Sequence, residues 1–550
     1  MENLVEIRDL QVEATTDSGR RVDIIKGVSL DIAPGEIVAL IGESGSGKTT
    51  IALTLMGYTR SGCHISRGNV RIDGKDMVAL SERERASIRG AEVAYVPQSA
   101  AAAFNPAKRI IDQVIEVTRI HQLMPVEQAR QKAIELFRAL SLPNPETIGS
   151  RYPHQVSGGQ LQRLSAAMAL IGDPKLVIFD EPTTALDVTT QIEVLRAFKS
   201  VLKAGGISGV YVSHDLAVVA QIADRIVVLR NGEVQEAGTT ADILSRAQHP
   251  YTRELLAAFE PKPRGHDVVV KGREVLLRVN GLFAGYGPIQ ADRLPLVRAV
   301  QDVSLTVEKG RNLGIIGESG CGKSTLARAI AGILPPFAGN MIFDKRELAG
   351  SVRQRSRDEL RKMQIVFQYA DTALNPEKSI EEILGRPLTF YHGIKGKQRD
   401  ARIDQLLDMV HLPKSLRHRR PQELSGGQKQ RVNFARALAA EPKLIICDEI
   451  TSALDTVVAA AIIDLLKELQ RELSLSYIFI SHDLSVVEAI CDEIVVMYAG
   501  RKVEEITPAH LKVPQHPYAK LLFSSVPKLD PGWLDSLELD PELVRTYGHS

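Results

Sequence analysis

The segment GEIVALIGESGSGKTT, residues 35–50, joins an apolar stretch to a glycine-rich turn and then to residues that favour the start of a helix. It fits the pattern GxxxxGK[ST], with Gly42, Gly47, Lys48 and Thr49 at the defining positions. Glycines let successive backbone N–H groups turn toward a phosphate, and the N-terminus of the following helix favours an anion. The segment therefore predicts a strand, a phosphate-binding loop and a helix.

The glycine-rich segment recurs in the second half of the chain as GESGCGKST at 317–325. Four other segments recur in the same order, at an offset that stays between 267 and 275 residues. These pairs are VSGGQLQR at 156–163 with LSGGQKQR at 424–431, LVIFDEPTTALD at 176–187 with LIICDEITSALD at 444–455, YVSHDL at 211–216 with FISHDL at 479–484, and HPYT at 249–252 with HPYA at 516–519. The offset is much longer than a solenoid repeat, so the pattern predicts a duplicated domain.

The length of 550 residues exceeds what one hydrophobic core usually organises, which agrees with two domains. We expect a first domain at 1–260, a linker at 261–274, a second domain at 275–525 and a C-terminal tail at 526–550. A flexible linker of this length spans on the order of 20 Å and holds the two halves at a concentration on the order of millimolar.

Composition argues against several functional classes. The 68 basic and 67 acidic residues give a net charge of +1, which provides no electrostatic footprint for a nucleic acid, so no nucleic-acid partner is expected. Because no apolar run is long enough for a membrane-spanning helix and the N-terminus lacks a secretory layout, we expect a cytoplasmic chain. The four cysteines form no CxxC pair, which predicts reduced thiols.

Both glycine-rich loops predict contacts with the phosphates of ATP. Lys48 and Lys323 would supply positive charge to the β- and γ-phosphates, and the hydroxyls of Thr49 and Ser324 would ligate Mg²⁺. ATP and Mg²⁺ are therefore the expected cofactors. The loop residues expected to hold the nucleotide are Gly42, Ser44, Gly45, Gly47, Lys48, Thr49 and Thr50 in the first half, and Gly317, Ser319, Gly320, Gly322, Lys323, Ser324 and Thr325 in the second.

The apolar segments LVIFDE and LIICDE each end in two adjacent carboxylates. Because neighbouring residues on a strand face opposite sides, the two carboxylates take different roles. We expect Asp180 and Asp448 to join the Mg²⁺ shell. Glu181 and Glu449 would polarise the attacking water, since in phosphoryl transfer the protein mainly positions groups and offsets charge. A solvated pair of carboxylates at a strand end is the alternative.

A histidine and a glutamine also follow apolar segments in both halves. His214 and His482 can reach a γ-phosphate; a lone histidine after a strand is more often structural, but its recurrence favours the functional interpretation. Gln98 and Gln368 can touch both Mg²⁺ and the attacking water, and the alternative is a glutamine in a surface loop. We predict that all four are catalytic and that the two glutamines also join the metal shell.

Together these segments resemble the ATP-binding-cassette (ABC) ATPases over nearly the whole chain. The most specific element is SGGQ, which a plain phosphate-loop enzyme does not need. In this family the segment opens a helix whose N-terminus faces the γ-phosphate held by the other domain, so that two domains pair head to tail around ATP. The residues that carry it are Ser157, Gly158, Gly159 and Gln160, and Ser425, Gly426, Gly427 and Gln428.

The resemblance implies an α/β fold with two tandem cassettes. Each would have a RecA-like phosphate-loop core, an antiparallel β subdomain and an α-helical subdomain, with helical inserts near 110–156 and 380–423. Each ATP site would combine residues of both halves. One site would join Lys48, Glu181 and His214 to Ser425–Gln428, and the other would join Lys323, Glu449 and His482 to Ser157–Gln160.

The two halves differ where the family stacks adenine on an aromatic residue. Alignment of RDLQVEA with NGLFAGY places Tyr286 at that position in the second half and Ala14 in the first. Stacking on an aromatic ring contributes about 1–3 kcal/mol. We therefore expect weaker ATP binding at the first site, unless an unaligned side chain nearby replaces the ring. Smaller departures from the family pattern are Val156 in place of leucine and Ile450 in place of the proline found at Pro182.

Three features resemble the oligopeptide, dipeptide and nickel importer branch. They are FNP at 104–106 with LNP at 374–376, YPHQVSGGQ at 152–160 with RRPQELSGGQ at 419–428, and the HPYT and HPYA segments. The resemblance implies the fused form of an importer ATPase, peripheral to the cytoplasmic face of the inner membrane. Its partners would be two permease chains and, indirectly, an extracytoplasmic solute-binding protein. Some members carry a cysteine-rich iron–sulfur segment, but 253–275 and 520–550 contain no cysteine, so no iron–sulfur cluster is expected.

Two other functions stay open. A soluble tandem cassette protein that acts on ribosomes has a similar length and duplication. Such proteins usually show a longer charged linker and the segment EPTNHLD, where this chain has EPTTALD and EITSALD. An exporter ATPase is the other alternative, and the HPYT and HPYA segments argue against it.

Overall fold

The computed structural model describes residues 3–15, 19–184, 186–259, 274–289, 294–452, 454–511 and 513–547. The chain forms two compact units. The first unit contains Met1–Ala257 and Ser524–Ser550, and the second contains Ala258–Phe523. The expected linker lies outside the described residues except for Glu274, and the domain boundaries stay a prediction.

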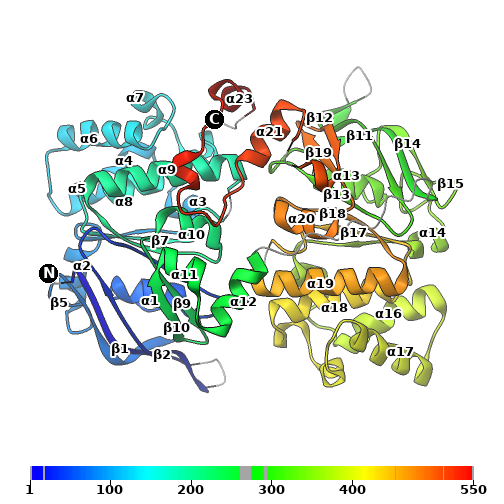
Figure 1. Ribbon diagram of the computed structural model, residues 1–550, viewed down its shortest axis with the longest axis horizontal. Helices are drawn as coiled ribbons and strands as arrows, with labels where there is room; N and C mark the ends of the chain where they lie inside the picture. The colour runs from blue at the N-terminus through cyan, green and yellow to red at the C-terminus, as the bar shows by residue number, and fades with distance from the viewer. Residues whose placement is uncertain are drawn as a thin grey trace. The chain divides into compact units, whose positions relative to one another are not determined.

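The core of the first unit is a six-stranded sheet in the order β10-β9-β3-β8-β7-β6. Figure 1 labels β7, β9 and β10 of this sheet. Only β10 is antiparallel to its neighbour. The strands are β3 (Ile37–Ile41), β6 (Val93–Val96), β7 (Leu176–Asp180), β8 (Ser208–Val212), β9 (Arg225–Arg230) and β10 (Glu233–Thr239). Every residue of β3, β7 and β8 is buried, which explains their continuous apolar sequences, because a parallel sheet is covered on both faces.

A second, antiparallel sheet in the first unit has the order β2-β1-β4-β5. Its strands are β1 (Val5–Thr15), β2 (Arg21–Ile32), β4 (Cys63–Ile72) and β5 (Lys75–Asp76). The two sheets share one hydrophobic core with α1. Val12 of β1, Ile51 of α1 and Ile178 of β7 all belong to this cluster, and burial of each such side chain stabilises the unit by about 1.5–3 kcal/mol.

Helices complete the first unit, and a group of them lies between β6 and β7 in sequence (Figure 1). This group covers the region of the expected helical insert. The helices are α1 (Lys48–Leu55), α2 (Glu82–Ile88), α3 (Ala100–Ala103), α4 (Ile110–Val114), α5 (Glu116–Ile120), α6 (Val126–Ala139), α7 (Pro145–Ile148), α8 (Gly158–Leu170), α9 (Val188–Gly205), α10 (Leu216–Ile222), α11 (Thr240–Arg246) and α12 (Pro250–Phe259), with a 3-10 turn η1 (Pro153–Gln155).

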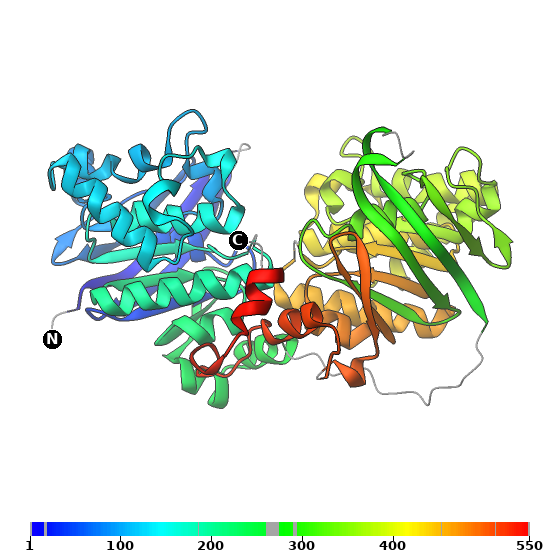
Figure 2. The same cartoon turned by 90° about the horizontal axis from the view of Figure 1, so that it is seen from above.

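The second unit repeats this plan, with sheet orders β16-β17-β18-β13-β19-β20 and β12-β11-β14-β15. Figure 2 shows its antiparallel sheet in green. The strands are β11 (Val275–Ile289), β12 (Pro295–Glu308), β13 (Asn312–Ile316), β14 (Ala338–Phe343), β15 (Arg346–Glu347), β16 (Met363–Val366), β17 (Leu444–Asp448), β18 (Ser476–Ile480), β19 (Glu493–Tyr498) and β20 (Arg501–Ile506). The expected α/β class, with two units of matching architecture, is confirmed.

The helices of the second unit fall at matching places in the sequence. They are α13 (Lys323–Ile330), α14 (Arg357–Lys362), α15 (Ala370–Ala373), α16 (Ile380–His392), α17 (Gly396–Met409), α18 (Gly426–Leu438), α19 (Thr456–Leu473), α20 (Leu484–Ile490) and α21 (Pro517–Ser524), with 3-10 turns η2 (Lys414–His418), η3 (Pro421–Glu423) and η4 (Pro508–His510). No helix in the described ranges of the chain is long and apolar enough to cross a membrane.

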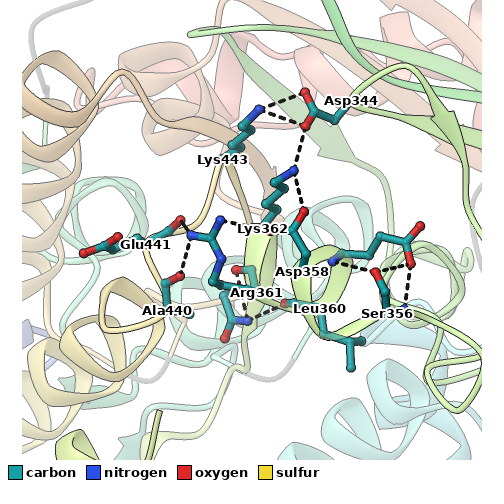
Figure 3. A network of polar contacts seen from close by, with 11 residues as sticks. Asp344, Ser356, Asp358, Leu360, Arg361, Lys362, Ala440, Glu441 and Lys443 are labelled. Carbon is teal, nitrogen blue, oxygen red and sulfur yellow. Dashed lines mark hydrogen bonds and ion pairs between the residues drawn. The ribbon is translucent and has the colours of Figure 1, made fainter. Parts of the chain in front are cut away.

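An ion-pair network joins the antiparallel sheet of the second unit to its core sheet (Figure 3). Asp344 follows β14 and accepts hydrogen bonds from the ammonium groups of Lys443 and Lys362, at 2.8 and 3.1 Å from its Oδ2. Lys362 also pairs with Asp358 at the other end of α14. The two lysines, Lys443 first, hold the pKa of Asp344 below its usual value.

The C-terminal segment packs on the first unit, although it follows the second in sequence (Figure 1). Its helices are α22 (Trp533–Ser536) and α23 (Pro541–Tyr547). Trp533 and Leu534 are buried, and the Gln221 side chain in α10 donates to the carbonyl oxygens of Lys528 and Asp530 at 2.7 and 3.0 Å. Its amide oxygen accepts the Leu534 N–H at 2.9 Å.

Candidate nucleotide-binding sites

The two glycine-rich loops have nearly the same backbone. Gly42 and Gly317 open them with φ angles of 146° and 148°, a conformation that favours glycine. A Cβ at Gly42 would lie 2.0 Å from the carbonyl oxygen of Leu229, and one at Gly317 would lie 2.2 Å from that of Met497. The end of β9 or β19 therefore presses against each loop, and only glycine fits.

The loop lysines lie at the first position of helices α1 and α13 and fold back over the loop. Lys48 Nζ donates to the carbonyl oxygens of Gly42 and Glu43 at 2.7 and 2.8 Å. Lys323 Nζ makes the matching bonds to Gly317 and Glu318 at the same distances. Both side chains are buried, and each ammonium group is hydrogen-bonded to carbonyl oxygens of its loop. A bound phosphate would offer the same ammonium group a full negative charge in place of these carbonyl dipoles.

A hydroxyl and a carboxylate meet at the end of β7 and again at the end of β17. Thr49 Oγ1 donates to Asp180 Oδ1 at 3.0 Å, and Ser324 Oγ donates to Asp448 Oδ1 at 2.9 Å. These oxygen donors are of the kind that Mg²⁺ takes in proteins, usually with phosphate oxygens and water completing the shell. Within the described ranges, no group of three or more histidine, cysteine or acidic side chains can hold a metal alone.

The carboxylate of Asp180 has a partner that the sequence reasoning missed. Tyr95 Oη, on the adjacent strand β6, donates to Asp180 Oδ2 at 2.8 Å. The corresponding residue in the second half, three positions before Gln368, is Ile365, which has no hydroxyl. There, burial and the neighbouring Glu449 charge raise the pKa of Asp448. A tyrosine in an otherwise apolar strand was visible in the sequence, but its partner was not.

The glutamate after each strand is the centre of a small polar cluster. In the first unit Gln98 Nε2 donates to Glu181 Oε2 at 3.1 Å, and His214 Nδ1 lies 3.3 Å from Glu181 Oε1. Burial opposes ionisation of Glu181, but the His214 imidazole and the Lys48 charge hold its pKa below the usual value. Burial also opposes protonation of His214, yet Glu181 raises its pKa.

The cluster in the second unit has the same members with one looser contact. Gln368 Nε2 donates to Glu449 Oε2 at 3.0 Å, but His482 Nδ1 lies 3.9 Å from that oxygen. The contact with His482 and the charge of Lys323 hold the pKa of Glu449 below its usual value, although burial opposes its ionisation. Gln368 also donates to Ser452 Oγ at 3.0 Å, a contact that was not predicted.

Both glutamates have a strained backbone. Glu181 and Glu449 have φ angles of 48° and 50°, in the left-handed region that non-glycine residues rarely adopt. Each is held there by its own N–H, which donates to the carbonyl oxygen of Val212 or Ile480 on the neighbouring strand. Strain of this kind gathers at functional positions, where it aims a side chain. Replacement of Pro182 by Ile450 leaves this conformation unchanged.

The SGGQ segments begin helices α8 and α18. Ser157 Oγ accepts the Gln160 N–H and the Gln160 side chain accepts the Ser157 N–H, both at 3.3 Å, which is a capping box. The second segment repeats it. A Cβ at Gly159 would meet Thr190 of α9 at 2.0 Å, but no described atom lies within 4 Å of the position that a Cβ at Gly158 would take. Contacts within the unit thus explain Ser157, Gly159 and Gln160, but they do not explain Gly158.

The sheet register supports the alignment of Ala14 with Tyr286. Asp9 in β1 and Gly281 in β11 both have left-handed φ angles, and their N–H groups donate to serine hydroxyls of the neighbouring strand. Ala14 and Tyr286 each lie five residues beyond this point. Tyr286 is 40% exposed, and its hydroxyl oxygen lies 3.3 Å from Thr325 Oγ1 in α13. The Tyr286 ring therefore lies beside the second phosphate loop, and Ala14 occupies the corresponding position in the first half.

Comparison with known proteins places the chain in a family. It matches the ABC transporter family over residues 25–184 and 300–452, and the C-terminal region of oligopeptide/dipeptide transporters over 235–277 and 505–547. The peptidoglycan transport ATP-binding protein YejF of Agrobacterium fabrum is 37% identical over 95% of this chain and 96% of its own length. The glutathione import ATP-binding protein GsiA of Escherichia coli K12 is 36% identical over 96% of this chain and 90% of its own.

A solved structure of cbiO1 from Clostridium perfringens, part of an ABC transporter complex, is 29% identical and covers 45% of this chain and 95% of its own, with a TM-score of 0.39. The family matches and the relatives cover both halves of the chain, including both phosphate loops and both strand-end carboxylate pairs. The chain therefore belongs to the ABC transporter family and is an ATPase that carries two ATP-binding units in one polypeptide.

Proposed function

We propose that this chain powers an importer of peptides or related small solutes. The observation that carries the proposal is that both halves match the C-terminal region of oligopeptide/dipeptide transporters, at 235–277 and 505–547. The relatives that match this chain over both halves are named for peptidoglycan transport and glutathione import. Neither the exporter nor the ribosome-acting alternative accounts for a transporter segment that is repeated in this way.

Within each unit, the glutamate is the residue best placed to polarise a water for attack on the γ-phosphate. Support comes from the low pKa of Glu181 and Glu449, which keeps both ionised at neutral pH. His214 and His482 would sense the γ-phosphate from beside these carboxylates. Gln98 and Gln368 would orient the same water, since each already donates to its glutamate.

Mg²⁺ fits the oxygen donors of Thr49 with Asp180 and of Ser324 with Asp448. When bound, it would offset the charge that develops on the phosphate oxygens. Gln98 and Gln368 would complete the protein part of each shell through their amide oxygens. Tyr95 would keep the Asp180 carboxylate oriented, so it acts on the first site as a positioning residue.

We further propose that each SGGQ segment serves the ATP held by the other half. The open space at Gly158 supports this, because a glycine with no steric reason inside its own unit suits a ligand that approaches the backbone closely. The N-terminus of α8, or of α18, would then face a γ-phosphate. ATP binding would favour the closed pair and hydrolysis would release it, which is a ligand-driven shift between two states.

The proposed partners are two permease chains, with an extracytoplasmic solute-binding protein acting through them. The chain would lie peripherally on the cytoplasmic face of the inner membrane. Permease segments would contact the region near Gln98 and Gln368, where a mechanical signal could reach Glu181 and Glu449 directly.

Deletion of the gene followed by uptake measurements with labelled di- and tripeptides tests the proposal. Uptake of at least one peptide should fall and should return with the wild-type chain. The double variant Glu181→Gln, Glu449→Gln should not restore it, whereas Glu254→Gln, at an exposed position of α12, should. Unchanged peptide uptake, together with copurification of the chain with ribosomes, would contradict the proposal.

A further inference from the structure

The HPYT and HPYA segments, at 249–252 and 516–519, are markers of the importer branch in the sequence. In the structure they begin helices α12 and α21, with the tyrosine at the second helical position. Tyr251 and Tyr518 are among the largest fully buried side chains, at 1% and 0% exposed. A buried tyrosine usually has a hydrogen-bond partner for its hydroxyl, so the partner indicates what the residue does.

The partner is the phosphate loop. The Glu43 N–H donates to Tyr251 Oη at 3.1 Å, across 208 residues of sequence. The Glu318 N–H donates to Tyr518 Oη at 3.0 Å, across 200 residues. Because Glu43 and Glu318 are the second residues of the two glycine-rich loops, each HPY tyrosine touches the first peptide group of its own loop.

That peptide group is held at both ends. In the first unit the Glu43 N–H is bound by Tyr251, and the Gly42 carbonyl oxygen of the same peptide accepts from Lys48 at 2.7 Å. The lysine must turn toward a phosphate when nucleotide enters, since its ammonium is the charge that the phosphates require. The tyrosine hydroxyl then still holds the N–H end of the peptide.

The two tyrosine rings are fixed by different residues in the two units. The guanidinium of Arg230, the last residue of β9, lies 4.4 Å from the centre of the Tyr251 ring. Tyr498, the last residue of β19, lies with its ring centre 4.5 Å from that of Tyr518. A cation lies over the ring in one unit and a second ring lies beside it in the other, so the loop contact is kept, at 3.1 and 3.0 Å, although the packing differs.

A carboxylate ties the turn before each HPY helix, residues 248–249 or 515–516, to the edge of the core sheet. Glu236 in β10 accepts the N–H groups of Gln248 and His249 at 2.8 and 3.1 Å. Glu504 in β20 does the same for Gln515 and His516, at 2.7 and 3.0 Å. The contacts thus run from the sheet edge through the turn to the loop.

We propose that Tyr251 and Tyr518 are positioning residues that set the affinity of their own phosphate loops for ATP. The inference rests on the proposed roles of the two loops. It assigns a role to the C-terminal region shared with oligopeptide/dipeptide transporters: that region holds the start of the phosphate loop. Loss of the hydroxyl removes the hydrogen bond that it gives the Glu43 or Glu318 N–H and lets the first peptide rotate more easily, so the loop must be reordered when ATP binds.

The test uses the full chain with one loop disabled. Tyr251→Phe is made in the Lys323→Ala background, and Tyr518→Phe in the Lys48→Ala background. We expect the Kd for ATP to rise about 3- to 10-fold in each, and in the otherwise intact chain we expect KM for ATP to rise with kcat little changed. Tyr477→Phe is the matched control, because its buried hydroxyl donates to the Leu466 carbonyl oxygen, away from the loop. It should leave Kd unchanged.

An unchanged Kd in both phenylalanine variants, with the same loss of stability as Tyr477→Phe, would overturn the inference. If a phenylalanine variant does not fold, Glu236→Gln loosens the same turn from the sheet edge and should raise Kd by a smaller factor; no change there also overturns it. ATP binding at wild-type affinity by the double variant Lys48→Ala, Lys323→Ala would instead refute the proposed role of the loops, and the inference would fall with it.

Discussion

The two units share the groups that would touch phosphate and water, yet differ in what surrounds those groups. Both have a lysine over the loop carbonyls, a hydroxyl on the strand-end aspartate, and a glutamate in a strained conformation beside a glutamine and a histidine. The differences lie one layer further out. The first unit has Tyr95 on its aspartate where the second has Ile365, and the second has Tyr286 where the first has Ala14.

The contrast indicates that the groups expected to touch phosphate and water stayed the same in both copies of the domain. The residues around those groups, which adjust the affinity for nucleotide, became different. A residue that must meet a phosphate oxygen or an attacking water has few substitutes. A residue that orients an aspartate or stacks on a base changes affinity by a limited factor, so the two copies can differ. We therefore predict two sites that are both built for hydrolysis but bind nucleotide unequally.

The largest expected effect comes from removing what the units share. Glu181→Gln with Glu449→Gln should lower ATP turnover by about 10²- to 10⁴-fold, the usual contribution of a general base, while ATP binding persists. Steady-state hydrolysis and nucleotide binding measure the two properties separately. Each single variant should lower turnover less than the pair, and full hydrolysis by the double variant would refute the assigned role.

The next effect concerns a feature that only the first unit has. The C-terminal segment docks through Gln221 and Arg196, whose counterparts in the second unit are Ala489 and Asp464. Trp533→Ala should destabilise the first unit by about 3 kcal/mol, because it empties a buried aromatic site. Amide exchange should accelerate in α9 and α10 and stay unchanged in α19 and α20.

Glu538→Ala, at an exposed position of the same segment, is the control for that variant and should change exchange in neither unit. Faster exchange in the helices of both units after Trp533→Ala would show that the segment does not serve the first unit selectively.

A smaller effect should follow from Tyr95→Phe in the Lys323→Ala background. The variant removes one hydrogen bond from Asp180 and leaves the bond from Thr49. The Mg²⁺ concentration that supports half-maximal ATP binding should rise about 3- to 10-fold. Tyr58→Phe, at an exposed tyrosine, should leave it unchanged. If the Lys323→Ala parent and the Tyr95→Phe and Tyr58→Phe variants need the same Mg²⁺ concentration, Tyr95 has no role in metal binding at the first site.

The smallest effect concerns the ion pairs between sheets, where Asp344 binds two lysines and its counterpart Asp73 is hydrogen-bonded to Lys175. Asp344→Asn should lower the stability of the second unit by no more than about 1 kcal/mol, since the pairs are partly exposed. Because its folded-state pKa is lowered, the carboxylate stabilises above the unfolded pKa of about 3.9, and this is lost as pH falls through the folded value.

Denaturant unfolding at pH 7 and near pH 3 measures how the stability contribution of Asp344 changes with pH. The difference between the wild-type chain and Asp344→Asn should be present at pH 7 and shrink at the lower pH, and Asp73→Asn should show a smaller difference at pH 7. A difference for Asp344→Asn that grows on acidification would contradict the assignment.

The sequence predicted the groups whose chemistry fixes both residue type and spacing. The phosphate loops, the carboxylate pairs and the duplication could be read because glycine, lysine and adjacent acids have few replacements there. The contact of Tyr95 with Asp180 was missed because it crosses between strands that are 85 residues apart in sequence. The HPY tyrosines were interpreted as family markers, since nothing local indicates a bond to a loop 200 or more residues away.

The docking of the C-terminal segment was missed for a related reason. Position in sequence suggests that a segment following the second unit belongs to it, but the backbone of Leu534 is hydrogen-bonded to Arg196 in α9 and Gln221 in α10 of the first. Side-chain complementarity across more than 300 residues carries no local periodicity or composition signal.

Titration of Lys48→Ala and Lys323→Ala with ATP tests the central claim most directly, because each variant leaves one site intact. Lys48→Ala keeps the site with Tyr286 and should bind ATP more tightly than Lys323→Ala by about 1–3 kcal/mol, the contribution of one stacked base. Adding Tyr286→Ala to Lys48→Ala should remove most of that advantage. Equal affinities in the two lysine variants, or tighter binding by Lys323→Ala, would contradict the claim that the two sites are unequal.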